Sequence, residues 1–272
     1  MAEPTVLTAS DGAPLNLWRT PARGTPSGSV LMLHGIQSHA GWYGPTRSVM
    51  AERGWETGFL DRRGSGRQTS GRGDTPNWMQ LVDDIAVALK ELTPRPRVLV
   101  GISWGAKVAL ATARKHTGLV DAVALIAPGL CPMVTLPWWQ RLGILIKRLL
   151  NPRALVDIPL SDPELFTSNP KWIKYLEQDR LCLHQATARF LVESAWLDSH
   201  LLSGRWKLPS LVQLAGRERI IDNLATRRWV RKRLMGPRLI LEYPRACHTL
   251  EFEDDDSWRR DLLSWMAGLS KK

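Results

Sequence analysis

Six short, almost uninterrupted apolar runs recur along this chain, and amphipathic segments separate most of them. Runs of this length without polar alternation are typical of strands that are buried on both faces of a sheet. When such strands alternate with helices, the sheet is parallel and helices cover both of its faces. The sequence therefore predicts an α/β fold with a mostly parallel, twisted sheet, whose strands lie at 29–33, 57–60, 98–102, 122–126, 211–214 and 239–243.

Two further features complete the expected fold. The segments 6–8 and 15–18 flank Asp11-Gly12, a pair typical of a hairpin turn, so we expect an antiparallel pair at one edge of the sheet. From about 131 to about 208 the alternation stops, and helical patterns, Trp and Pro replace any convincing strand. We therefore expect a core at 1–130 and 209–272, interrupted by a helical insertion at 131–208.

Composition limits the class of protein. Apolar residues make up 44% of the 272 positions and charged residues 23%, an ordinary globular balance. No run of about eighteen uncharged apolar residues is present, and the N-terminus lacks the basic and apolar regions of a secretory signal. Cys131, Cys182 and Cys247 are far apart and lack metal-ligand spacing. We therefore expect a cytoplasmic protein without a metal site.

A nucleophile is predicted at the end of the third buried run. The strand at 98–102 leads directly into Gly101-Ile102-Ser103-Trp104-Gly105, and a helical pattern follows at once. The pattern G-x-S-x-G between a strand and a helix is typical of a serine held on a sharp turn. The two glycines let helix and strand approach closely, and the helix N-terminus favours a developing negative charge. Ser103 is the expected nucleophile, and the alternative is an ordinary tight turn.

A serine nucleophile needs a general base and an acid that orients it. Among the six histidines, His248 is the best placed, because it follows the last predicted strand. Glu218 and Asp222 both follow the strand at 211–214, and either could orient the imidazole. Glu218 is favoured because it comes first in the loop, whereas Asp222 opens the next helical pattern and is a good N-cap.

Backbone N–H groups for an oxyanion hole are expected at two places. One belongs to Trp104, the residue after the nucleophile. The other belongs to Ile36, in the loop after the strand at 29–33. His34, which precedes the glycine of this loop, is expected to pack or to form a local hydrogen bond. The alternative is that this loop is an ordinary glycine turn.

Six segments, in order, resemble the monoglyceride-lipase and lysophospholipase-like branch of the α/β-hydrolases, sometimes grouped with serine aminopeptidases. They are SDGAPLNLW, LHGIQSHAGWYGP, DRRGSGRQTSGRGD, GISWGAKVAL, LAGRERIIDN and YPRACHTLEF. The resemblance implies an α/β-hydrolase fold with a triad of Ser103, Glu218 and His248, and with oxyanion donors at Ile36 and Trp104. It also implies that the insertion is a lid that carries the acyl-binding groove.

The chain departs from this family at four positions. Glu218 stands where aspartate is usual, Ile36 where a small residue is usual, and Ala106 where glycine is usual. Ser65 stands where histidine is common, and we interpret the 61–66 loop as structural. The departures at Ile36 and Ala106 indicate an acyl pocket of a different shape.

The insertion begins with an amphipathic segment, WWQRLGILIKRLL at 138–150. At about 100° per residue its apolar side chains fall on one arc and its three basic side chains on the other. A basic amphipathic helix with Trp at one end fits a membrane interface, and the alternative is a lid helix packed over the active site. We expect substrate contacts from Trp138, Trp139, Leu142 and Ile146.

The net charge of +11 requires an explanation. Nucleic-acid binding would need basic residues interleaved with stacking aromatics or a known reader motif, and neither is found. The charge instead favours anionic lipid surfaces or lipid substrates. We expect a cofactor-free serine hydrolase of single-chain lipid esters, such as monoacylglycerols or lysophospholipids. The alternatives are a short-chain carboxylesterase or thioesterase, an aminopeptidase-like amidase, and a membrane-binding protein with a vestigial site.

Overall fold

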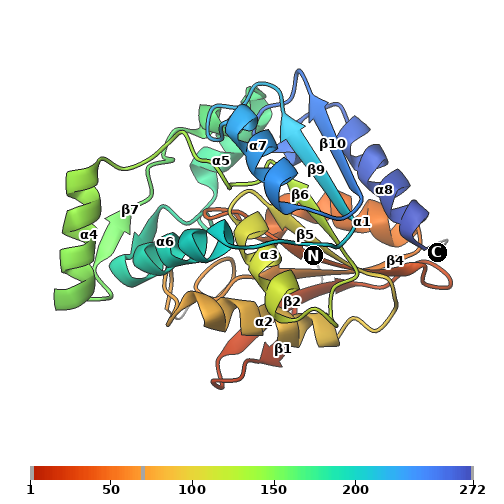
Figure 1. The fold of residues 1–272 in the computed structure, drawn as a ribbon, viewed down its shortest axis with the longest axis horizontal. Helices are drawn as coiled ribbons and strands as arrows, with labels where there is room; N and C mark the ends of the chain where they lie inside the picture. The colour runs from red at the N-terminus through yellow and green to blue at the C-terminus, as the bar shows by residue number, and fades with distance from the viewer. Residues whose placement is uncertain (1–2, 69–70, 271–272) are drawn as a thin grey trace.

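The structure, a computed structural model, describes residues 3–68 and 71–270; Thr69 and Ser70 of the DRRGSGRQTSGRGD segment lie outside the described residues. Within the described residues, eight strands form one sheet in the order β1-β2-β4-β3-β5-β6-β9-β10 (Figure 1). The prediction of a mostly parallel α/β sheet is confirmed, since all six apolar runs are strands. The parallel strands are β3 (Gly28–Leu33), β4 (Trp55–Asp61), β5 (Arg97–Ile102), β6 (Ala122–Ile126), β9 (Ser210–Ala215) and β10 (Arg238–Tyr243).

The expected hairpin occupies one edge of this sheet. Strands β1 (Thr5–Thr8) and β2 (Pro14–Thr20) pair in antiparallel fashion, and β2 continues antiparallel onto β4. In the turn, Gly12 has a φ of +81°, a conformation that glycine adopts without steric cost. The Asp-Gly signal in the sequence therefore predicted this turn correctly.

Helices cover both faces of the sheet (Figure 1). Because side chains alternate along a strand, each strand contributes to two cores: in β3, Leu31 and Leu33 face one way and Val30 and Met32 the other. One face is covered by α2 (Trp78–Lys90), α3 (Gly105–Lys115) and α7 (Asn223–Arg233), and the other by α1 (Gly44–Glu52) and α8 (Ser257–Leu269). Two short 3₁₀ helices, η1 (Ala40–Tyr43) and η3 (Leu250–Phe252), lie in loops.

The insertion lies between β6 and β9. Its elements are α4 (Trp138–Leu150), β7 (Leu155–Asp157), η2 (Pro163–Leu165), α5 (Pro170–Gln178), β8 (Gln185–Thr187) and α6 (Ala188–Leu202). The expectation that this segment contains no strand is wrong, because β7 and β8 pair in antiparallel fashion. Three residues are too few for a strand period to appear in a sequence. The division of the chain at 131 and 208 stays a prediction.

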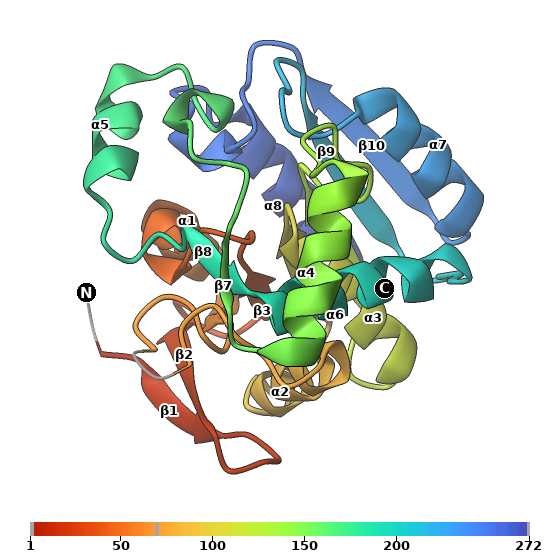
Figure 2. The same ribbon diagram turned by 90° about the vertical axis from the view of Figure 1, so that its left-hand side faces the viewer.

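Within the insertion, α6 packs on the core and α4 lies outermost. The α6 side chains Phe190, Leu197 and Leu201 belong to the same core cluster as α2 and α3. In α4, which is described in full, only Ile144 is buried, and it contacts Ala188 and Val192 of α6. Figure 2 shows α4 standing in front of α6 on the outer side of the molecule. Across the described residues, no helix combines the length and the apolar character needed to span a membrane.

A buried carboxylate ties the loop after α5 to the core. Asp179 Oδ2 accepts hydrogen bonds from His39 Nε2 at 2.9 Å and from Trp42 Nε1 at 2.7 Å, and its Oδ1 accepts from the Leu181 N–H. Burial alone would raise the pKa of Asp179, but the hydrogen bonds from His39 and Trp42 outweigh it, so the pKa falls below its ordinary value. Nearby, the Leu183 N–H donates to the Gln37 carbonyl at 2.9 Å. The insertion is thus attached to the loop that follows β3.

We predict that Asp179→Ala lowers the free energy of unfolding by about 2–4 kcal/mol, because the buried donors of His39 and Trp42 lose their acceptor. Urea denaturation measures the change. Asp157→Ala, which alters an exposed carboxylate in the same insertion, should stay within about 0.5 kcal/mol of wild type. Equal effects of the two substitutions would contradict the role assigned to Asp179.

Candidate active site

Ser103 lies on a sharp turn between the end of β5 and the start of α3. Its φ is +51°, in the left-handed region that residues other than glycine rarely adopt. Its N–H donates to the Ile126 carbonyl at 2.9 Å, and its carbonyl accepts from the N–H groups of Ala106 and Gly129 at 3.0 and 2.8 Å. These bonds hold a strained residue at the carboxyl edge of the sheet, as in the turn that exposes a serine nucleophile.

The glycines on either side of Ser103 allow helix and strand to meet at this turn. A Cβ at Gly101 would lie 2.5 Å from the Cα of Ala106. A Cβ at Gly105 would lie 2.6 Å from two backbone carbonyl oxygens at the end of β3. Both collisions are with backbone, which cannot move aside as a side chain can. The G-x-S-x-G pattern is therefore a steric requirement here.

The structure brings Ser103, His248 and Glu218 together in one hydrogen-bonded line. His248 Nε2 is 2.9 Å from Ser103 Oγ, and His248 Nδ1 is 2.8 Å from Glu218 Oε2. The other carboxylate oxygen, Glu218 Oε1, accepts from the N–H groups of Arg219 and Ile220 at 3.0 and 2.8 Å. With Nδ1 protonated and donating to this fixed carboxylate, Nε2 presents its lone pair to the serine hydroxyl.

Asp222, the alternative acid, lies elsewhere. Its side chain accepts a hydrogen bond from the Ala225 N–H at 2.9 Å and caps the N-terminus of α7. Asp222 is therefore an ordinary helix N-cap, a position where aspartate is common. Glu218, which the sequence favours because it comes first in the loop, is the acid that lies beside His248.

Residues of the insertion complete the surroundings of His248. The Phe166 ring lies edge-on to the imidazole with centroids 6.0 Å apart. The Phe166 carbonyl accepts a hydrogen bond from the Thr249 N–H at 2.9 Å. His248 is 4% exposed, so the relay is shielded from bulk water on this side. The sequence contained no signal for Phe166.

The loop after β3 lies directly against Ser103. A Cβ at Gly35 would be 3.3 Å from the Ser103 Cβ, so the absence of a side chain sets this closeness. The Ser38 hydroxyl accepts a hydrogen bond from the Gly35 N–H at 2.9 Å and closes the loop. Among the described residues, neither the Ile36 N–H nor the Trp104 N–H donates a hydrogen bond to the protein. Two unpaired donors beside a serine are what an oxyanion hole requires.

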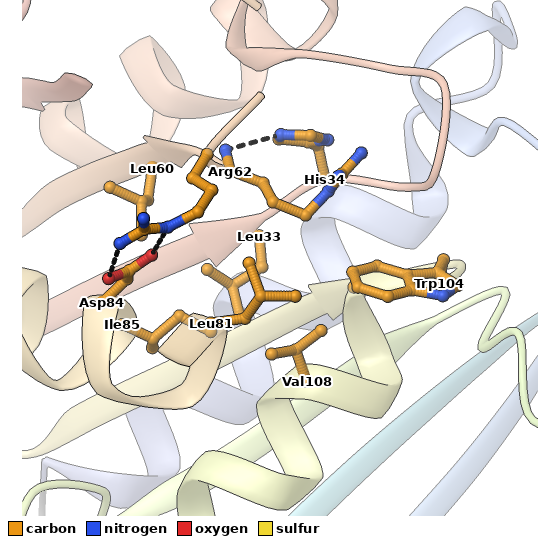
Figure 3. Close-up of a pocket in the computed structure, with 11 residues that line it drawn as sticks. Leu33, His34, Leu60, Arg62, Leu81, Asp84, Ile85, Trp104 and Val108 are labelled. Atoms are coloured by element: carbon orange, nitrogen blue, oxygen red, sulfur yellow. Dashed lines mark hydrogen bonds and ion pairs between the residues drawn. The ribbon is translucent and has the colours of Figure 1, made fainter. Parts of the chain in front are cut away.

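His34 and Arg62 connect this loop to the loop after β4. His34 Nδ1 lies 2.7 Å from the Gly35 carbonyl, and Nε2 accepts the Arg62 N–H at 2.9 Å (Figure 3). Burial and the Arg62 cation hold the pKa of His34 well below its ordinary value, so the ring is neutral and can bond in this way. The local role expected for His34 fits this geometry. The sequence does not identify Arg62 as a residue of the site, because nothing in it distinguishes Arg62 from the other residues of the 61–66 loop, which we interpret as structural.

A small cavity lies below the nucleophile turn, between the sheet and helices α2 and α3 (Figure 3). Its volume is about 20 Å³, room for about one water molecule. A larger groove of about 540 Å³ lies between α4 and α6, lined by Ile144, Leu145, Leu191 and Ser194 among others. Ser194 Oγ accepts a hydrogen bond from Trp104 Nε1 at 2.8 Å, so this groove begins beside the nucleophile turn.

The four α4 residues predicted to contact substrate are exposed to solvent. Trp138, Trp139, Leu142 and Ile146 are between 48% and 72% exposed, and the two Trp rings pack edge-to-face at 5.9 Å. The α4 side chains that line the groove are Arg141, Ile144 and Leu145. The structure therefore does not bring the four predicted residues toward Ser103. In the described part of the chain, no cluster of three or more His, Cys, Asp or Glu could hold a metal ion.

One family model and two known proteins resemble this chain, over different shares of its length. A family model described as serine aminopeptidase, S33, matches residues 24–255, which include Ser103, Glu218 and His248. A monoacylglycerol lipase of Mycolicibacterium smegmatis (strain ATCC 700084 / mc(2)155) is 23% identical over 225 residues, 74% of this chain and 77% of that protein. An uncharacterized abhydrolase domain-containing protein of Dictyostelium discoideum is 33% identical over 105 residues, which are 38% of this chain but only 11% of that protein.

The fold is also shared with solved structures. The crystal structure of a monoacylglycerol lipase from Paleococcus ferrophilus superposes with a TM-score of 0.80 at 22% identity, covering 93% of this chain and 99% of that one. At this identity the likeness concerns the fold, whereas the family match extends over the sequence motifs of the site. The chain belongs to the serine aminopeptidase S33 family.

Proposed function

We propose that this protein hydrolyses carboxylic esters of single-chain lipids, of the monoacylglycerol or lysophospholipid type, through an acyl-enzyme on Ser103. The observation that carries the proposal is the line from Ser103 through His248 to Glu218, beside two unpaired backbone donors. The name of the Mycolicibacterium relative, a monoacylglycerol lipase, supports this substrate class.

The proposed reaction has two acyl-transfer steps. Ser103 Oγ attacks the ester carbonyl carbon while His248 Nε2 takes the hydroxyl proton, and Glu218 stabilises the imidazolium. The Ile36 and Trp104 N–H groups bind the oxyanion, at about 3 kcal/mol per donor. His248 returns the proton to the leaving alcohol, and a water molecule activated by His248 then releases the carboxylic acid. In both steps the proton is transferred through the His248 imidazole, so the rates of both steps depend on the position of this ring.

The groove between α4 and α6 is the proposed site for the acyl chain. Its lining is mainly apolar and includes Val134, Leu136, Ile144 and Leu191. It adjoins Ser194, which is bonded to the Trp104 side chain, so an acyl chain in the groove would have its carboxyl end near Ser103. A mainly apolar groove with a few polar groups is typical of ligand sites.

The outer face of α4 is the proposed contact with an anionic membrane surface. Seven apolar side chains on this helix are between 44% and 82% exposed: Trp138, Trp139, Leu142, Leu145, Ile146, Leu149 and Leu150. Arg141, Lys147 and Arg148 accompany them, and the chain as a whole carries +11. An apolar stripe with cationic residues beside it suits the interface of an anionic bilayer. A lipid ester could then pass from the bilayer into the adjoining groove.

Ester hydrolysis tests the function directly. We expect wild-type protein to hydrolyse p-nitrophenyl esters with rates that rise from acetate toward octanoate, because a longer chain fills more of the groove. Ser103→Ala should lower kcat by about 10⁵-fold or more, since it removes the nucleophile. A preference for acetate would favour a short-chain esterase. Equal inertness of both proteins toward esters and monoacylglycerols would refute the proposal.

The acid of the triad has a matched pair of substitutions. Glu218→Gln keeps the shape of the side chain but favours the wrong histidine tautomer, so kcat should fall by about 10⁴-fold. Asp222→Asn changes a helix cap, and it should leave kcat nearly unchanged while costing at most about 1 kcal/mol of stability. Steady-state kinetics and urea denaturation measure these effects, and the reverse pattern would assign the role to Asp222.

Vesicle sedimentation tests the role of α4. We expect binding to anionic phosphatidylglycerol vesicles, and Leu149→Ser combined with Leu150→Ser should weaken it by about tenfold or more, because two exposed leucines no longer enter the interface. Val6→Ser, at an exposed apolar residue of β1, serves as the control. Undiminished binding by the double variant would show that α4 is not the contact.

A further inference from the structure

Arg62 is a buried cation without a carboxylate at ion-pair distance among residues 3–68 and 71–270. It is 8% exposed. Its Nη2 donates to the Ile36 carbonyl at 2.9 Å, whereas Nε and Nη1 have no hydrogen-bond partner in the described structure. The adjacent Arg63, in contrast, forms ion pairs with Asp11 and Asp84. Stability alone does not explain a buried guanidinium with so few partners.

Two aromatic rings take the place of a counter-ion. The guanidinium carbon of Arg62 lies 5.2 Å from the centroid of the Trp104 ring and 4.6 Å from that of the Phe190 ring. These distances allow cation–π attraction, which is stronger where water is excluded. Burial and the nearby Arg72 lower the pKa of Arg62 to about 9, partly offset by Asp61, so the side chain stays protonated at pH 7.

The place of this charge is informative, because Arg62 contacts both residues that carry the proposed oxyanion donors. Its bond to the Ile36 carbonyl fixes the peptide plane that follows Ile36. Its stacking on Trp104 fixes the side chain of the other donor residue. Its own N–H is held by His34, which precedes the loop (Figure 3). The backbone of Arg62 is thus bonded to His34, beside the loop, and its guanidinium contacts the two residues that carry the donors.

We propose that Arg62 is a positioning residue of the oxyanion hole, which orients the Ile36 loop and keeps a permanent positive charge behind the two N–H donors. The inference rests on the proposed function, since an oxyanion forms only if Ser103 attacks a carbonyl. A charge fixed in a water-poor site is oriented before the reaction begins and attracts the negative oxygen of the tetrahedral intermediate more strongly than it would in water. The neutral substrate carbonyl gains less, so the effect belongs to the transition state.

A second buried arginine provides a matched control. Arg47, on α1, is also 8% exposed and lies over the Trp18 ring at 5.7 Å, and its Nε has no hydrogen-bond partner among the described residues. Burial lowers the pKa of Arg47 as it does that of Arg62. It resembles Arg62 in burial and aromatic contact, but it belongs to α1 and, within the described structure, forms no hydrogen bond with Ile36 and does not lie over the Trp104 ring. Replacing either arginine by methionine removes a buried cation, and only Arg62→Met removes one from behind the hole.

The first measurement is steady-state ester hydrolysis by Arg62→Met, Arg62→Lys and Arg47→Met, with melting temperatures recorded for each. We expect Arg62→Met to lower kcat by about tenfold or more with KM within about twofold of wild type, which marks a loss confined to the transition state. Arg62→Lys should recover part of kcat because it retains the charge, and Arg47→Met should retain wild-type kcat. If Arg62→Met did not fold, the kcat of Arg62→Gln, which lacks the charge, would be compared with that of Arg62→Lys, which retains it.

The second measurement separates charge stabilisation from structural support. An alkyl trifluoromethyl ketone is attacked by Ser103 Oγ, which passes its proton to His248 and leaves an oxyanion in the hole. The matching methyl ketone binds in the same groove without being attacked. Arg62→Met should weaken inhibition by the trifluoromethyl ketone about tenfold, equal to about 1.4 kcal/mol, and leave the methyl ketone nearly unaffected. Equal weakening of both, or of neither, would overturn the proposal for Arg62.

Ser103→Ala distinguishes this failure from failure of the proposed function. If Ser103→Ala abolished turnover while Arg62→Met matched wild type in both measurements, the hydrolase would stand and the role of Arg62 would fall. If Ser103→Ala left turnover unchanged, the proposed function and the inference that rests on it would fall together.

Discussion

The close approach of α3 to the ends of β3 and β5 is the contact on which the site depends. Gly105 lies against the carbonyl oxygens that end β3, and Gly101 lies against the Cα of Ala106. This approach forces the chain between them through the left-handed conformation of Ser103. It also sets the serine against Gly35, so nucleophile and oxyanion loop become neighbours through backbone packing alone. A Cβ at Gly101 would push α3 away from β5, and a Cβ at Gly105 would push α3 away from the end of β3. The geometry of the site depends on both contacts.

The insertion belongs to this arrangement rather than covering it from outside. Phe166 packs against the His248 ring, Ser194 accepts the Trp104 indole N–H, and Phe190 lies over Arg62. The loop before β8 bonds to Gln37, in the loop that follows β3. The outermost helix, α4, has far fewer such ties, and most of its apolar side chains remain exposed. The insertion therefore has a part that packs against the site and an outer helix that makes few contacts with the core.

Charge is distributed in two different ways in this basic protein. Many of the 37 Lys and Arg side chains are solvated or paired with one of the 26 acidic residues. Among the described residues, buried Arg63 and Lys107 also pair with carboxylates, whereas buried Arg62 and Arg47 contact aromatic rings or the backbone instead. Total charge describes only the first group, which sets long-range attraction. The buried cations act at short range, and the effect of each depends on the atoms that contact it.

The sequence by itself determined the sheet, the edge hairpin and the turn that carries Ser103, because local patterns encode burial and backbone conformation. It also narrowed the partners of Ser103 to one histidine and two acids, since the carboxyl ends of parallel strands meet at one edge. Tertiary structure decided what depends on distance across the fold: that Glu218 bonds to His248 while Asp222 caps α7, and that the four predicted α4 side chains face solvent. Only the packed structure distinguishes Arg62 from Arg63, its neighbour of the same type, because ion pairing and stacking join residues far apart in the chain.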